Sequence, residues 1–192
     1  PAFVQRGAMV AVVEYDLCPN VTVTDIVRQT RASIASLYRN VARYGGDPSQ
    51  LYVCGHSAGG HLVAMALAHD WEIDGLPRDV IKGAVAMSGV HDLDMVMHVS
   101  ANEQIRMTPE IAKANSPFLH PPLSVGPVIV TVGGAEPEGW KQMSKDYFQL
   151  CKERGLRCEY LEVPGANHYT MSDHLADPKS PLNLAIMKLM NL

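Results

Sequence analysis

The chain has 192 residues, with 16 Lys and Arg against 20 Asp and Glu and a formal net charge of −4. This mild acidic excess, without any run of basic residues, argues against a nucleic-acid partner. No apolar stretch approaches the roughly 20 residues that cross a bilayer, so no membrane span is predicted. Apolar residues make up 47% and charged residues 19% of the sequence, which is typical of one soluble domain with a sizeable core.

The four cysteines form no C-x-x-C pair and lie in apolar segments, which favours reduced thiols used as small hydrophobic residues. We therefore expect a cytoplasmic protein without a disulfide framework. No histidine or carboxylate pattern indicates a metal site, and nothing in the sequence predicts a cofactor. The sequence leaves the oligomeric state open, a homo-oligomer included.

The predicted elements begin with residues 7–15, a near-continuous apolar run typical of a strand buried on both faces of a parallel sheet. A helix is expected over residues 25–44, with Thr22 or Thr24 as its N-cap and Gly45 at its end. The following elements are a strand 51–54, a helix 61–69, strands 81–87 and 127–132, a helix 138–154, a strand 157–163 and a helix 182–189. This alternation predicts an α/β fold, with a mostly parallel sheet covered by helices on both faces.

Residues 92–122 interrupt the alternation with a polar, Met-rich segment between the third and fourth predicted strands of the sequence. Within it, Thr108 followed by Pro109 marks the start of a helix. A long insertion after a sheet strand is a common place for a lid or a binding wall. We therefore expect a cap-like insertion in a single catalytic domain that covers residues 1–192.

The sequence GHSAG at residues 55–59 matches G-x-S-x-G and stands between a predicted strand and a predicted helix. This is the context of a nucleophile elbow, in which a strained turn lifts a serine oxygen above the sheet. Ser57 is thus the candidate nucleophile. The backbone N–H of Ala58, at the start of the helix, is a candidate donor to the oxyanion.

A serine hydroxyl needs a positioned base, and eight histidines compete for that role. His168 follows the last predicted strand in a turn-rich loop, at the sheet edge where sites of α/β proteins assemble. His56 and His61 are close to the serine in sequence, but we interpret them as packing or hydrogen-bonding residues. His168 is therefore the candidate base.

The third member of a catalytic triad should be a carboxylate just after the strand 127–132, where it can orient the imidazole. Two acids follow that strand, Glu136 at the tip of the loop and Glu138 at the start of the next helix. We favour Glu136 as the triad acid and keep Glu138 as the alternative.

Five motifs together resemble the α/β-hydrolase esterase/lipase family, most closely its kynurenine formamidase (arylformamidase) branch. They are LCP at 17–19, GHSAGGHL at 55–62, SGVHDL at 88–93, VGGAEPE at 132–138 and PGANH at 164–168. The resemblance covers essentially the whole chain. It implies an α/β-hydrolase fold and hydrolysis of N-formyl-kynurenine to kynurenine and formate.

The sequence departs from this family at two points. The family usually has Asp at the acid position, whereas this chain has Glu136. The family also carries a His-Gly-Gly motif after its third strand that completes the oxyanion hole, and this sequence has none. Its first predicted strand resembles the family's fourth, so we expect the C-terminal two-thirds of a longer hydrolase that lacks the N-terminal strands.

The sequence therefore predicts a serine hydrolase that acts on a small acyl amide or ester. The first alternative is a general carboxylesterase for short-chain or aryl esters. The second, from another class, is a non-catalytic binding module with the same fold. One serine elbow serves esters, amides and thioesters alike, so the sequence leaves the choice of substrate open.

Overall fold

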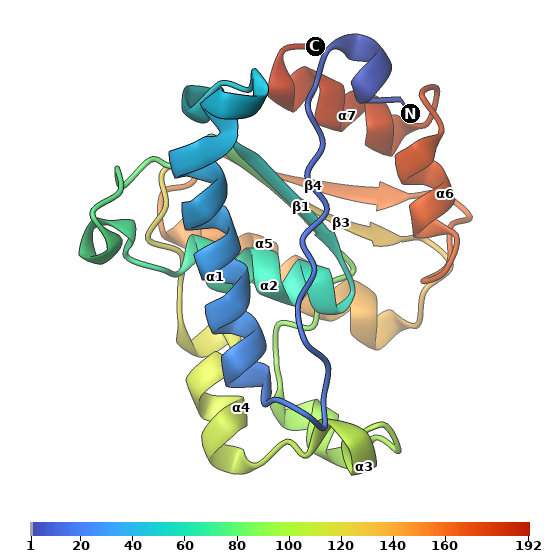
Figure 1. Cartoon of the computed structure of the whole chain (residues 1–192). Helices are drawn as coiled ribbons and strands as arrows, with labels where there is room; N and C mark the ends of the chain where they lie inside the picture. Colours follow the sequence, from blue (N-terminus) through green and yellow to red (C-terminus); the bar gives the residue numbers. More distant parts are fainter. Residues whose placement is uncertain (1) are drawn as a thin grey trace.

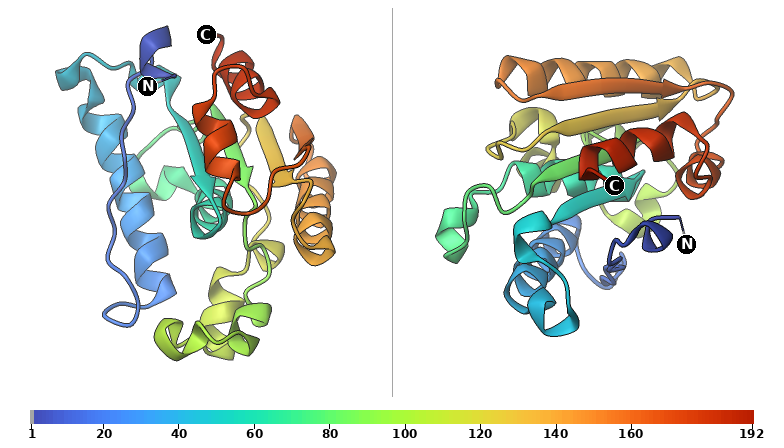
Figure 2. Two further views of the ribbon diagram at one scale, coloured as in Figure 1. Left: turned by 90° about the vertical axis from the view of Figure 1, so that its right-hand side faces the viewer. Right: turned by 90° about the horizontal axis from the view of Figure 1, so that it is seen from above.

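The computed structural model describes residues 2–192, and four of its apolar segments pair into a fully parallel sheet. The strands are β1 (Tyr52–His56), β2 (Gly83–Met87), β3 (Val128–Gly133) and β4 (Cys158–Val163). They lie side by side in their chain order (Figure 2). Because all four strands are parallel, their carboxyl ends meet at one edge of the sheet.

Helices cover both faces of this sheet (Figure 1). Alternate residues of a strand point to opposite faces; Ala84 and Ala86 pack in one apolar cluster, and Val85 and Met87 pack in another. The first face is covered by α1 (Val23–Asn40), α2 (Ala58–Leu67) and α5 (Glu138–Glu153), the second by α6 (Met171–Ala176) and α7 (Pro181–Met190). The predicted α/β class with helices on both faces is confirmed.

Local sequence signals explain where α1 begins and ends. The Thr22 hydroxyl accepts a hydrogen bond from the backbone N–H of Asp25, whose carboxylate in turn accepts from the Thr22 N–H. This capping box makes Thr22 the N-cap in preference to Thr24. The chain then tightens into a 3-10 turn that stops at Gly45, whose φ of 86° suits glycine.

Short 3-10 helices connect several of these elements. They are Val4–Arg6, Val41–Tyr44, Pro48–Gln50, Trp71–Asp74, Asp94–His98 and Pro117–Leu119. No helix in the described part of the chain is both long and apolar enough to cross a membrane.

The prediction of a strand over residues 7–15 is wrong. This segment runs as extended chain outside the sheet (Figure 1). Its apolar side chains are largely exposed, Val12 to 90%. A groove of about 1130 Å³ separates it from β1, and both line the groove. The segment has the composition of a buried strand, but no strand of the described sheet is close enough to pair with it.

The insertion at residues 92–122 contains two helices, α3 (Asn102–Ile105) and α4 (Pro109–Asn115), the second capped by the Thr108 hydroxyl as predicted. It buries Leu93, Met107 and Ala112 in a small cluster with the start of α1. The insertion is thus attached, at the start of α1, to the helical layer on the first face of the sheet.

Candidate active site

Ser57 occupies the sharp turn between β1 and α2. Its backbone has φ 57° and ψ −115°, a strained conformation for a residue with a side chain. A Cβ on Gly55 would lie 2.2 Å from the carbonyl oxygen of Gly59, so the turn requires glycine at that position. Helix α2 begins at Ala58, three residues earlier than predicted, because the elbow leads directly into it. This geometry is that of a nucleophile elbow.

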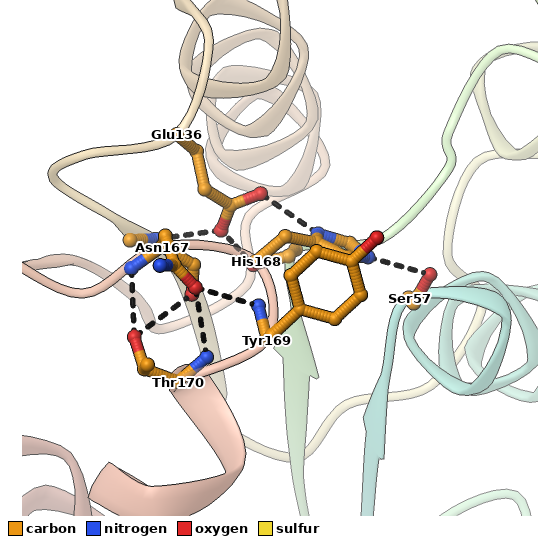
Figure 3. A network of polar contacts seen from close by, with 8 residues as sticks. Ser57, Glu136, Asn167, His168, Tyr169 and Thr170 are labelled. Atoms are coloured by element: carbon orange, nitrogen blue, oxygen red, sulfur yellow. Dashed lines mark hydrogen bonds and ion pairs between the residues drawn. The ribbon is translucent and has the colours of Figure 1, made fainter.

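His168 lies in the loop between β4 and α6 and reaches the serine (Figure 3). Its Nε2 is 2.9 Å from Ser57 Oγ, and its Nδ1 is 2.9 Å from Glu136 Oε2. The Asn167 side chain holds the loop by accepting hydrogen bonds from the backbone N–H groups of Tyr169 and Thr170. A proton on Nδ1 would face the carboxylate and leave Nε2 free to accept from the serine hydroxyl.

Glu136 is the carboxylate that contacts His168. Its side chain is fully buried, and its Oε1 accepts hydrogen bonds from the Gly133 N–H and the Ser88 hydroxyl. Glu138 points away and is exposed on the first turn of α5, where its carboxylate lies 2.8 Å from Lys141 Nζ. The hydrogen bond from Lys141 holds the pKa of Glu138 below its usual range. The structure thus brings Glu136, and not Glu138, to the imidazole.

Two rings lie close to the imidazole of His168. The ring of Trp140, in the first turn of α5, lies 4.5 Å from the imidazole between centroids, and that of His56 lies 4.6 Å away. Burial, followed by repulsion from His168, lowers the pKa of His56. His56 therefore packs against the candidate base, in line with its predicted packing role.

Ala58 is the first residue of α2, so its backbone N–H has no acceptor within the helix. Ala58 is exposed and adjoins Ser57 at the elbow. The positive end of the helix dipole lies at the same place and also stabilises a negative charge there. This placement suits a donor to an oxyanion that forms at an acyl group attached to Ser57.

Sequence reasoning missed Ser88, the buried partner of Glu136. The residue directly follows β2, at the same sheet edge as Ser57 and His168. That position is the signal that could have revealed it, since polar side chains at the carboxyl ends of parallel strands converge.

Two other histidines are buried in the core. His61 Nε2 lies 2.8 Å from the carbonyl oxygen of Asn115. The His91 ring stacks on Tyr147 at 3.9 Å, and neither of its nitrogens has a hydrogen-bond partner among residues 2–192. Within the same residues, no group of three or more His, Cys, Asp or Glu side chains could hold a metal ion.

Both buried histidines should make stability pH-dependent. Burial lowers the pKa of His61 to about 4 and that of His91 to about 3, whereas an unfolded histidine titrates near its ordinary value of 6.5. The unfolded chain therefore takes up these protons first, and the free energy of unfolding falls as pH drops from about 6.5 towards 4. Each histidine should contribute a slope of about 1.4 kcal/mol per pH unit.

We expect His91→Phe to remove one of these two contributions, which urea unfolding at pH 7, 6 and 5 would measure. His98→Gln, at an exposed position, is the control and should leave the slope unchanged. An unaltered slope in His91→Phe would contradict the expectation.

Comparison with known proteins identifies the family. The profile of the alpha/beta hydrolase fold matches residues 3–172. The chain belongs to this family. It is also similar to the kynurenine formamidases of Danio rerio and Salmo salar, each 33% identical over 97% of this chain. The chain spans 64% of the length of each of these two relatives.

Solved structures agree with this assignment. A structure from Silicibacter sp. superposes with a TM-score of 0.80 at 29% identity, covering 97% of this chain and 66% of its own. A thermophilic esterase from Thermogutta terrifontis superposes with a TM-score of 0.67 at 26% identity, covering 90% of this chain and 65% of its own. The predicted α/β-hydrolase fold is thus confirmed by sequence and by structure.

Proposed function

We propose that this chain carries the catalytic machinery of a serine hydrolase that cleaves a small acyl amide or ester. One observation carries the proposal: a continuous chain of hydrogen bonds joins Glu136, His168 and Ser57 at a strained strand–helix turn. A base within hydrogen-bond reach of a nucleophile, itself oriented by a third group, is the arrangement that activates a serine.

In the proposed mechanism each of these groups has one step. Ser57 Oγ attacks the acyl carbonyl carbon while His168 Nε2 takes the hydroxyl proton. The Ala58 N–H donates to the oxyanion, and Glu136 stabilises the imidazolium. His168 then passes the proton to the leaving amine or alcohol, which departs and leaves an acyl-serine. Water, activated by the same imidazole, releases the carboxylic acid and restores Ser57.

N-formyl-kynurenine is the substrate that we favour, giving formate and kynurenine. The kynurenine formamidases of two fishes are 33% identical to the chain over nearly its whole length. Trp140 beside the imidazole also offers an aromatic face to an aryl leaving group. All four cysteines are free thiols, which favours a reducing compartment, and we place the reaction in the cytoplasm.

The test is a comparison of two substrates on the purified protein. We expect kcat/KM for N-formyl-kynurenine to exceed that for 4-nitrophenyl acetate, as measured by absorbance of the released products. A formamide value several orders of magnitude below the ester value would overturn the formamidase assignment.

That second outcome would favour a general carboxylesterase. This alternative is supported by the likeness to the esterase of Thermogutta terrifontis, and it uses the same three side chains. The alcohol of an ester is a better leaving group than the amine of an amide, so such an enzyme needs to assist its departure less.

A further inference from the structure

Ser88 is held in an unusual conformation at the end of β2. Its φ is +45°, in the left-handed region that residues with a side chain rarely adopt, and its side chain is fully buried. Its backbone N–H donates to the Thr131 carbonyl at 2.7 Å, which ties it to β3. Backbone strain of this kind persists where the surrounding structure enforces it, often at functional sites.

The Ser88 hydroxyl donates a hydrogen bond to Glu136 Oε1. The same oxygen accepts from the Gly133 N–H at 2.9 Å, while Oε2 faces His168 Nδ1 at 2.9 Å. The two carboxylate oxygens therefore have different partners. Oε1 is hydrogen-bonded to groups at the sheet edge, and Oε2 faces the imidazole. Because the carboxylate is planar, fixing the first oxygen fixes the direction of the second.

A glutamate has particular need of such an anchor. Its side chain has one more methylene and one more torsion than aspartate, so it loses more rotamer freedom when it is held in one position. The Ser88 hydroxyl donates a hydrogen bond to the end of this longer side chain.

We propose that Ser88 is a positioning residue that holds the Glu136 carboxylate against His168 and so allows glutamate to serve as the triad acid. This inference rests on the proposed serine-hydrolase function. Ser88 acts through Glu136 and touches no reacting atom.

The experiment measures how fast a fluorophosphonate probe labels Ser57 as a function of pH, with the site of labelling identified by peptide mapping. Labelling requires the activated serine but no particular substrate. We expect Ser88→Ala and Ser88→Gly to label about 10- to 100-fold more slowly than the parent protein, the range for losing a hydrogen bond to a charged group. The acidic limb of the profile should shift as well, because labelling needs a neutral imidazole and the carboxylate that stabilises the imidazolium has lost one of its donors.

The two variants separate positioning from folding. Glycine suits a φ of +45° better than alanine, so Ser88→Gly should unfold at a temperature no lower than Ser88→Ala. Both variants should nevertheless label Ser57 slowly if the Ser88 hydroxyl positions Glu136. Ser124→Ala removes another buried serine hydroxyl, one without a partner in the described chain, and is the control that should label at the parental rate.

The outcomes distinguish this inference from the proposed function. A parent protein that does not label at Ser57 would overturn the serine-hydrolase proposal itself. A parent that labels while Ser88→Gly labels equally fast, with an unmoved acidic limb, would overturn the role of Ser88 alone.

Discussion

Ser57→Ala should lower kcat/KM for the preferred substrate by about 10⁴-fold or more, because the removed oxygen forms the covalent intermediate. Alanine keeps the Cβ at φ 57°, so the backbone strain of the elbow and the packing of α2 should be unchanged. His168→Ala should cost about as much, and the double variant little more, since the two groups act as one unit. Steady-state kinetics on the three variants would measure this.

The control for this result is covalent labelling. A fluorophosphonate probe should modify Ser57 in the parent protein and leave Ser57→Ala unlabelled, while thermal unfolding shows that both are folded. Absence of a Ser57 adduct in the folded parent would instead favour the non-catalytic binding module.

Glu136→Gln should lower kcat by about 10³- to 10⁴-fold. The amide has the same size as the carboxylate, so the pocket formed with Gly133 and Ser88 stays filled. It carries no charge, however, and can present N–H to His168, which removes the stabilisation of the imidazolium and favours the wrong tautomer.

Glu138→Gln is the matched control for this substitution, because it makes the same chemical change two residues away. Glu138 is exposed and pairs with Lys141, so kcat should change less than about twofold. A large loss in Glu138→Gln together with a small one in Glu136→Gln would reverse the assignment of the acid.

Local sequence was sufficient to predict most elements of the fold. The strands β1 to β4 are short apolar runs between turn residues, and α1 and α5 are amphipathic, so their patterns reflect burial directly. Residues 7–15 have the same apolar character, yet they lie outside the sheet. Composition reports that a segment suits a buried strand, but pairing needs a neighbour, and that depends on the rest of the structure.

Some residues of the candidate site could likewise be predicted from local sequence, and others could not. Ser57 could be located because the elbow is a local motif, and Glu136 and His168 because each follows a strand at the same sheet edge. The sequence favoured Glu136 over Glu138 from its place at the tip of the loop, but only the folded structure shows which side chain turns inward to His168. Ser88 is 48 residues from Glu136 in the chain, and no local sequence pattern predicts a contact between residues so far apart.

Each of the four strands is followed by one member of the hydrogen-bond chain. Ser57 follows β1, Ser88 follows β2, Glu136 comes after β3 and His168 after β4, and the serine and histidine that meet are 111 residues apart. Contacts between such distant residues form late, because the loops between them must close first. During refolding from denaturant, helical signal should therefore return before enzymatic activity, and recovered activity would report that all four strands have reached their register.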